Sequence, residues 1–171
     1  MAARLETRSD CSRCAALCCI AYPSDDMPGF AASKQAGEAC PKLGDDGRCT
    51  IYERREEAGF SGCIRFECFG AGQHVAEHLF KGRDWREDPA LLRPMVEAFL
   101  AMRPVSDLAF LVSRALQTAP AETIATELVR LQEELADIGS SLESLAQTVR
   151  VARAQAAVRR VYAEIDPDAV K

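Results

Sequence analysis

Eight cysteines dominate the chemistry that this sequence could perform. Four of them fall within the nine positions of CSRCAALCC, residues 11–19, and two of these four are adjacent. Thiols this close together can bind metal, form disulfides or act as reactive nucleophiles. The candidate metal ligands are all eight: Cys11, Cys14, Cys18, Cys19, Cys40, Cys49, Cys63 and Cys68.

The setting of these cysteines favours metal binding over disulfides. The opening residues MAARLETRSD lack the apolar run of a secretory signal, and no stretch approaches the roughly 18 apolar residues of a membrane span. We therefore expect a cytoplasmic protein without membrane attachment. Because cytoplasmic thiols are kept reduced, a cysteine-rich segment there is more often a metal or redox site. Buried free cysteines are the alternative for single positions.

The adjacent pair, Cys18 and Cys19, favours more than one metal atom. Successive side chains diverge in helices and strands, so neighbouring cysteines cannot easily point at one small ion. They fit better as ligands of two metals, or of different atoms of one cluster. Eight thiols suffice for two four-sulfur sites, or for one site with structural or reactive cysteines to spare.

Iron is the favoured metal, held in an iron-sulfur cluster such as 4Fe-4S. Zinc knuckles usually place Gly directly after the second cysteine, whereas Ala15 follows Cys14 in this chain. The dipeptide Cys40-Pro41 matches the Cys-Pro ending of bacterial ferredoxin motifs. Zn2+ is the second candidate and copper(I) the third.

Composition divides the chain into a metal-binding module at residues 1–72 and a helical bundle at 73–171. The loops from Tyr22 to Lys42 are rich in Pro, Gly and Asp and can bury little apolar surface, so a metal is a natural source of their order. The first part carries 9 basic and 11 acidic residues, and the second carries 12 basic and 15 acidic residues. Neither has the basic patch that nucleic-acid binding requires.

Local signals predict the elements that position the cysteines. Ser9 or Asp10 can cap a short helix on which Cys11, Cys14 and Cys18 would share one stripe. Residues 49–52 indicate a short strand or extended entry, followed by about two helical turns that end at Gly59.

The second part is predicted to be helical, starting with residues 71–80. Asp88 and Pro89 open the next helix. Pro104 should end or kink that helix, so that residues 105–118 form a separate segment. A further helix is expected to open at Pro120.

Apolar residues then recur at alternating steps of three and four, as in a heptad seam. One uninterrupted coiled-coil helix is an alternative. We favour a helical hairpin because Gly139 is a stop signal and the segment from Ser140 to Glu143 forms a capping box. The seam comprises Ile124, Leu128, Leu131, Leu135, Ile138, Leu142, Leu145, Val149, Ala152 and Ala156. The expected fold is mainly α: a loop-rich, metal-organised N-terminal module packed on a helical bundle with a C-terminal hairpin.

Two further features offer weaker candidates. His74 and His78 would share a helix face, as in zinc metalloproteases, but position 75 is Val rather than the catalytic Glu. We expect an ordinary helix face near the cysteine module, with metal ligation as the alternative. Trp85, the sole tryptophan, is expected to anchor the bundle on that module.

The cysteine motifs resemble those of a known family. CSRCAALCC followed by CPKLGDDGRCTIYERREEAGFSGCIRFEC is similar to the bacterial CxxCxxCC cysteine-cluster family, described as a zinc- or iron-chelating domain. The likeness covers about residues 11–90 and is closest to cysteine-rich segments that precede pentapeptide repeats, which this chain lacks. Three residues rather than two separate Cys14 from Cys18, and the spacing from Cys49 to Cys63 is wider than usual.

These patterns predict a metal-thiolate binding protein that acts as a structural, regulatory or redox-sensing module. A relative of the CxxCxxCC motif in flagellin lysine methylases is associated with an iron-sulfur cluster. That resemblance implies the alternative of a metal-cluster enzyme or accessory factor in protein modification or electron transfer. Metal storage or delivery is a third hypothesis. The expected partners are metal ions and a protein bound through the C-terminal helices, with neither nucleic acid nor membrane.

Overall fold

The computed structural model describes residues 4–24, 27–118 and 120–165, and the described chain is mainly helical, as predicted. Its helices are α1 (Leu17–Ala21), α2 (Ser61–Arg65), α3 (Ala71–His74), α4 (Leu92–Gln117), α5 (Glu122–Ile138), α6 (Leu142–Leu145) and α7 (Thr148–Ile165). Shorter turns are η1 (Cys11–Arg13), η2 (Tyr52–Arg54) and η4 (Pro89–Leu91), with a π-helical segment, η3 (Val75–Leu79), continuing α3. Across these described ranges the only β pairing is an isolated bridge between Leu43 and Cys49.

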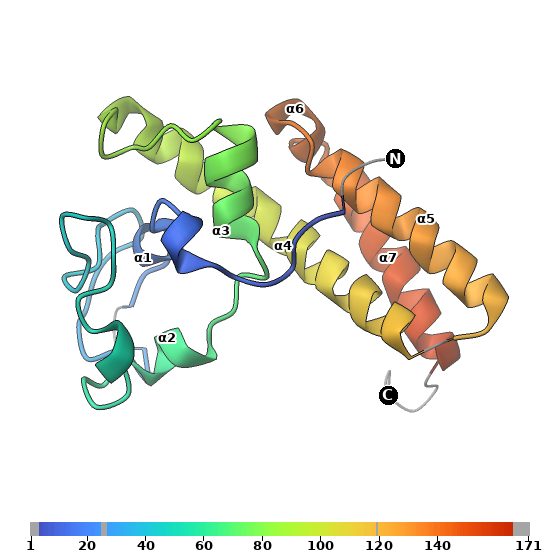
Figure 1. Cartoon of the computed structure of the whole chain (residues 1–171), viewed down its shortest axis with the longest axis horizontal. Helices are drawn as coiled ribbons and strands as arrows, with labels where there is room; N and C mark the ends of the chain where they lie inside the picture. The colour runs from blue at the N-terminus through green and yellow to red at the C-terminus, as the bar shows by residue number, and fades with distance from the viewer. Residues whose placement is uncertain (1–3, 25–26, 119, 166–171) are drawn as a thin grey trace.

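Two lobes meet along the long helix α4 (Figure 1). The cysteine lobe, residues 11–70, consists of loops around the short helices α1 and α2. The helical lobe, residues 92–165, packs α4, α5 and α7 against one another. Because α4 also contacts α1, α3 and η3, it forms part of the support of both lobes.

Helix α4 passes through Pro104, so the expected break at this residue is wrong. Pro104 lies on the exposed side of the helix, where water can reach the carbonyl that it leaves without a helical partner. Met102 and Val105 beside it are fully buried. Burial of this apolar face outweighs the lost hydrogen bond and keeps residues 105–117 in the same helix.

The C-terminal hairpin is confirmed, because α5 ends at Ile138 and α7 returns along it. Its cap lies one residue later than expected: the Ser141 hydroxyl accepts from the Ser144 amide at 3.1 Å. The Ser140 hydroxyl instead donates to the Asp137 carbonyl at the end of α5. Helix α5 likewise begins at Glu122, two residues after Pro120.

The heptad seam holds only up to the hairpin turn. Its positions in α5 from Leu128 to Ile138 are buried, as is Leu145 in α6. Beyond the turn, by contrast, the seam positions Leu142, Val149, Ala152 and Ala156 are exposed. The buried α7 residues are Ala154, Ala157, Val158 and Val161. The turn interrupts the helix and resets its phase, so a repeat counted through the turn assigns the wrong face.

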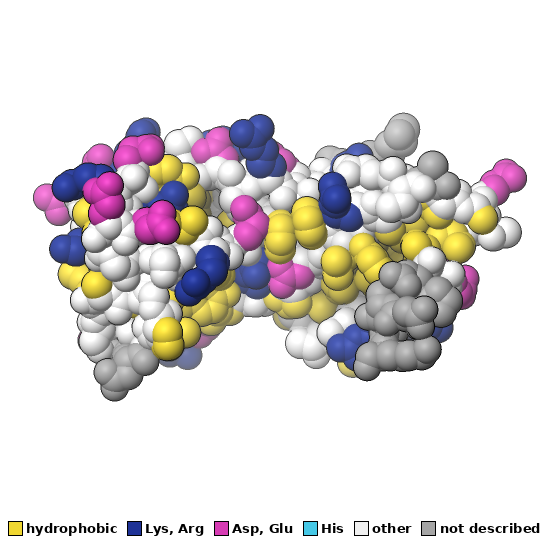
Figure 2. Space-filling view, turned by 90° about the horizontal axis from the view of Figure 1, so that it is seen from below, with side chains coloured by type: hydrophobic (Ala, Val, Ile, Leu, Met, Phe, Trp, Pro, Cys, Tyr) yellow, Lys and Arg dark blue, Asp and Glu magenta, His cyan; other side chains and the backbone are white. Residues whose placement is uncertain are grey.

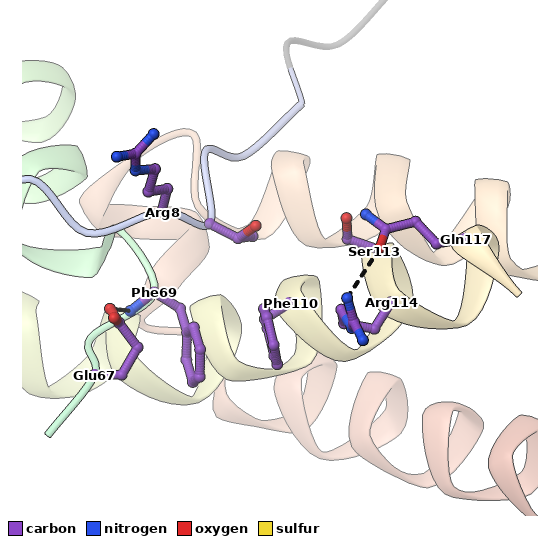
Figure 3. Close-up of a pocket in the computed structure, with 8 residues that line it drawn as sticks. Arg8, Glu67, Phe69, Phe110, Ser113, Arg114 and Gln117 are labelled. Atoms are coloured by element: carbon purple, nitrogen blue, oxygen red, sulfur yellow. Dashed lines mark hydrogen bonds between the residues drawn. The ribbon is translucent and has the colours of Figure 1, made fainter. Parts of the chain in front are cut away.

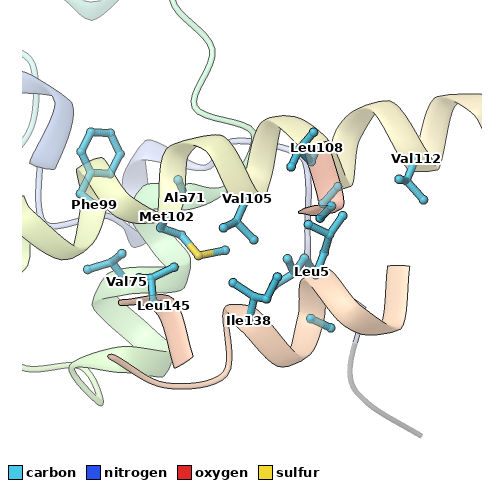
Figure 4. Close-up of a cluster of buried hydrophobic side chains, with 14 of the residues drawn as sticks. Leu5, Ala71, Val75, Phe99, Met102, Val105, Leu108, Val112, Ile138 and Leu145 are labelled. Atoms are coloured by element: carbon cyan, nitrogen blue, oxygen red, sulfur yellow. The ribbon is translucent and has the colours of Figure 1, made fainter. Parts of the chain in front are cut away.

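One apolar core runs from the helical lobe into the cysteine lobe. Figure 4 shows Phe99, Met102 and Val105 of α4 in this core, together with Val75 and Leu145. Leu17 of α1, which precedes the adjacent cysteines, is fully buried in the same core. Burial of α1 against α4 therefore fixes the backbone from which the two adjacent cysteines project.

The surfaces of the two lobes differ in character. In Figure 2 charged side chains of both signs gather over the cysteine lobe, whereas hydrophobic atoms form a broken band along the helical lobe. Within the described ranges no helix is sufficiently long and apolar to cross a membrane.

Candidate metal centre

The first two cysteines lie on a tight turn rather than on a helix shared with Cys18. The Asp10 side chain accepts from the Ser12 amide at 2.9 Å and caps η1, which confirms the predicted cap. The short helix then ends at Arg13, and Ala16 adopts a left-handed conformation with φ 54° before α1 begins. The expected single helical stripe of Cys11, Cys14 and Cys18 is therefore wrong.

The sulfur of Cys14 provides the physical reason for this turn. It accepts hydrogen bonds from the backbone amides of Ala16 and Leu17, which wrap the chain around the sulfur. Helix α3 packs closely on the other side, where a Cβ atom at Gly72 would lie 2.4 Å from the Cys14 sulfur. Any larger residue at position 72 would have to displace this sulfur.

The adjacent cysteines occupy the second and third positions of α1. The thiol of Cys18 donates to the sulfur of Cys19, which lowers the pKa of Cys19 to about 7 and raises that of Cys18. Lys34 and Arg55 lie near Cys19, and their positive charge favours its thiolate in the same direction.

Cys40 and Cys49 come from one loop that docks on α1. The Cys40 amide donates to the Cys19 carbonyl at 3.0 Å, and the Lys42 amide approaches the Cys40 sulfur at 3.5 Å. The Leu43–Cys49 bridge then returns the chain toward Cys40. The extended entry predicted at residues 49–52 is reduced to this bridge, followed by η2 and turns up to Gly59.

The last two cysteines flank the exit from the cysteine lobe. Cys63 lies in α2. Cys68 precedes α3, and its sulfur lies 2.9 Å from the Ser9 hydroxyl. The Ala71 amide donates to the Cys68 carbonyl at 3.0 Å. Cys68 is thereby fixed between the N-terminal segment and the first turn of α3.

All eight cysteines are free thiols, and seven of them are partly buried, whereas Cys11 is exposed. Burial raises the pKa of Cys14 to about 12 and that of Cys63 to about 11. Burial of the sulfur raises the pKa of Cys11 and Cys40 as well. Neighbouring thiolates raise both pKa values further. Such thiols stay protonated at neutral pH unless a cation compensates the thiolate charge.

In the described chain, no three side chains of the His, Cys, Asp and Glu types converge on a single point as metal ligands. The donors nevertheless fit a thiophilic metal in kind, since backbone amides point at two of the sulfurs and eight free thiols are available. A change of χ1 rotamer moves a cysteine sulfur around its Cβ atom, so the backbone places the donors more firmly than the individual rotamers do.

Sequence patterns alone did not reveal the contribution of Lys34. Its side chain is buried, and its ammonium group donates to the backbone carbonyls of Ile20 and Tyr22. A loop lysine between Ser and Gln carries no local signal of burial. Its position depends on the pairing of residues 20–24 with residues 34–37, which brings a cation near Cys19 and Cys40.

His74 contacts the hairpin turn, whereas His78 is exposed. Their rings lie 4.9 Å apart, and His74 Nε2 lies 2.8 Å from the Gly139 carbonyl oxygen. Burial lowers the pKa of His74. Trp85, in the segment before α4, donates its indole N–H to the Ala15 carbonyl at 2.8 Å, in agreement with its predicted anchoring role.

An open cavity of about 340 Å3 lies between the two lobes (Figure 3), and two of its lining residues flank Cys68 in the sequence. Glu67 and Phe69, on either side of this cysteine, line it together with Arg8, and Phe69 stacks on Phe110 of α4 with 4.1 Å between the ring centroids. Its remaining lining residues are Thr7, Ser113, Arg114 and Gln117.

Comparison with known proteins identifies a similar chain. The uncharacterized protein YybG of Bacillus subtilis (strain 168) is 36% identical to it over 120 residues. The match covers 70% of this chain and 43% of YybG, so the chain spans less than half the length of this relative. No protein-family model and no solved structure matches the chain.

Proposed function

We propose that this chain is a metal-thiolate protein whose cysteine lobe binds an iron-sulfur cluster, or zinc, as a structural, regulatory or redox-sensing module. One observation carries the proposal: four separate segments, at residues 11–19, 40–49, 63 and 68, bring eight free thiols into one lobe. The resemblance to the CxxCxxCC family supports the same function.

The local environment of the thiols adds support. Amide donors at Cys14 and Cys40 stabilise thiolates, the form in which cysteine binds metal. Bound to these thiolates, a metal centre would supply cross-links between loops that have little core of their own, and in the iron-sulfur form a one-electron redox couple. Partial burial of seven cysteines favours a structural or sensing role over metal storage, which requires exposed, exchangeable thiolates.

Elemental analysis of anaerobically purified protein, combined with its ultraviolet-visible spectrum, tests the proposal. We expect bound iron, inorganic sulfide and a broad absorption near ~400 nm, which is typical of iron-sulfur clusters. A colourless protein that contains zinc would reassign the metal and retain the metal-thiolate function. Purified protein with neither metal, and with eight freely titratable thiols, would contradict the proposal.

The cavity between the two lobes favours a second candidate function, a metal-cluster enzyme or accessory factor in protein modification or electron transfer. Residues of both lobes line this cavity. Two of them, Glu67 and Phe69, are the sequence neighbours of Cys68, a candidate metal ligand. The substitution Phe110→Trp would fill part of the space. If the cavity receives a substrate or protein partner, this variant should keep its metal and lose activity or binding; unchanged activity would argue against a role for the cavity.

A further inference from the structure

We propose that the eight cysteines form two separate four-thiolate metal sites, one from Cys11, Cys14, Cys18 and Cys68 and the other from Cys19, Cys40, Cys49 and Cys63. The first set is named the helix-side set, because Cys14 and Cys68 lie against α3, and the second the loop-side set, because it includes the docked loop of Cys40 and Cys49. This inference rests on the proposed metal-thiolate function and adds the number of sites and their ligands.

Proximity among the helix-side cysteines supports the first set. Cys14 lies within electrostatic range of both Cys11 and Cys68, and Cys11 is close to Cys68 and, more weakly, to Cys19 of the other set. Cys18 lies near Cys14 and Cys11, and its thiol also donates to the sulfur of Cys19, the adjacent cysteine of the other set. Packing of Cys14 against Gly72 and the contact of Cys68 with Ser9 hold these cysteines beside the start of α3.

Proximity defines the second set in the same way. Cys63 of α2 lies within electrostatic range of Cys19, Cys40 and Cys49. Cys40 is also close to both Cys19 and Cys49. The hydrogen bond from the Cys40 amide to the Cys19 carbonyl fixes the loop on α1. Four cysteines from three elements are therefore neighbours of one another.

The same backbone arrangement occurs once in each set. In the helix-side set, the amide two residues after Cys14, that of Ala16, donates to the cysteine sulfur. In the loop-side set, the amide two residues after Cys40, that of Lys42, approaches its sulfur at 3.5 Å. Amide donors aimed at a sulfur favour a thiolate, so each set contains one cysteine whose backbone is prepared for metal binding.

Charges near the two sets differ. Lys34 lies near Cys19 and Cys40 of the loop-side set, whereas Cys11 of the helix-side set has both Arg55 and Glu67 near it. Four thiolates with a divalent cation carry a net charge of −2, so a nearby lysine stabilises the loop-side site by attraction. The two sites meet at the peptide bond between Cys18 and Cys19, which places adjacent cysteines in different sites.

A matched pair of variants, Cys68→Ser and Cys63→Ser, tests the division. In each purified variant we expect half of the wild-type metal content. Mass spectrometry after alkylation with iodoacetamide should show which thiols lose protection. Cys68→Ser should expose Cys11, Cys14 and Cys18 alone, and Cys63→Ser should expose Cys19, Cys40 and Cys49 alone.

A milder variant, Gly72→Ala, keeps all eight thiols and displaces only the Cys14 sulfur, so it covers the case in which removal of a cysteine prevents folding. It should expose the helix-side set and leave the loop-side set protected. Exposure of all cysteines at once in this variant would overturn the division in favour of one shared cluster, as would exposure of a mixed group. Wild-type protein without metal would contradict the proposed function itself.

Discussion

The two lobes are held together by different means. Helix α4 alone buries eleven side chains. In the cysteine lobe, by contrast, Phe60 is the one apolar side chain that is buried among the described residues from 22 to 60. Such a loop region cannot offset the conformational entropy lost on folding through apolar burial alone. The comparison indicates that the helical lobe can fold on its packing, whereas the cysteine lobe needs additional cross-links.

Removal of metal should have the largest effect and should divide the molecule along this boundary. With a chelator and a reductant, we expect amides of residues 27–60 to lose protection from hydrogen exchange, because the proposed metal cross-links are gone. Amides of α4 and α5 should remain protected. Hydrogen exchange measured by mass spectrometry checks this, and equal loss of protection in both lobes would break the comparison.

A core substitution in the helical lobe should have the opposite effect: it should destabilise the helical lobe and leave metal binding unchanged. Leu135 of α5 is fully buried, so Leu135→Ala should lower the free energy of unfolding by about 2–5 kcal/mol through lost burial and a cavity. Metal content should stay unchanged. Urea denaturation followed by circular dichroism measures the effect. Val129→Ala, at an exposed position of the same helix, serves as the control and should change stability by about 0.5 kcal/mol or less.

The junction between the lobes should be sensitive at Gly70. This residue has φ +79°, and a Cβ atom there would lie 2.1 Å from the backbone oxygen of Glu6. Gly70→Ala should therefore destabilise the protein by more than the roughly 1–2 kcal/mol expected for a left-handed alanine alone. Gly82, with φ +77° and open space around its Cα, is the matched control. Equal losses in Gly70→Ala and Gly82→Ala would show that the contact with Glu6 adds nothing.

The smallest expected effect is a pH dependence of the contact between His74 and the hairpin. Burial lowers the pKa of His74, so the unfolded chain binds a proton more readily than the folded protein. The contribution of His74 is complete above its ordinary pKa of 6.5 and is lost as the pH falls through the lower, folded value. Thermal melts across this range should show a steeper loss of stability in the wild type than in His74→Gln. Parallel curves would contradict this assignment.

Local patterns were sufficient to predict much of the helical lobe. Apolar spacing from Ile124 to Ile138 and the stop at Gly139 predicted the hairpin because these signals depend on neighbouring residues. The break expected at Pro104 failed because the outcome depends on which face of α4 is buried, and that is decided by distant elements. The phase of α7 was missed because the repeat was counted through the hairpin turn, which resets the helical phase.

The cysteine lobe was predicted in composition and not in geometry. The sequence identified all eight cysteines, but it did not predict that the thiol of Cys18 donates to the sulfur of Cys19. It could not show that Cys40 docks on Cys19, nor that Cys68 lies beside Ser9, because these contacts join residues far apart in the chain. Glycine at position 72 likewise gave no sign that it faces the Cys14 sulfur.

The bond from Trp85 to the Ala15 carbonyl has a practical consequence. Trp85 is the sole tryptophan of the chain, and its indole is attached to the turn that surrounds Cys14. Selective excitation of tryptophan fluorescence therefore gives an optical signal from this boundary alone, without a label. The emission wavelength of Trp85 should follow the opening of the cysteine lobe in real time, while the helical lobe contributes no tryptophan signal to the spectrum.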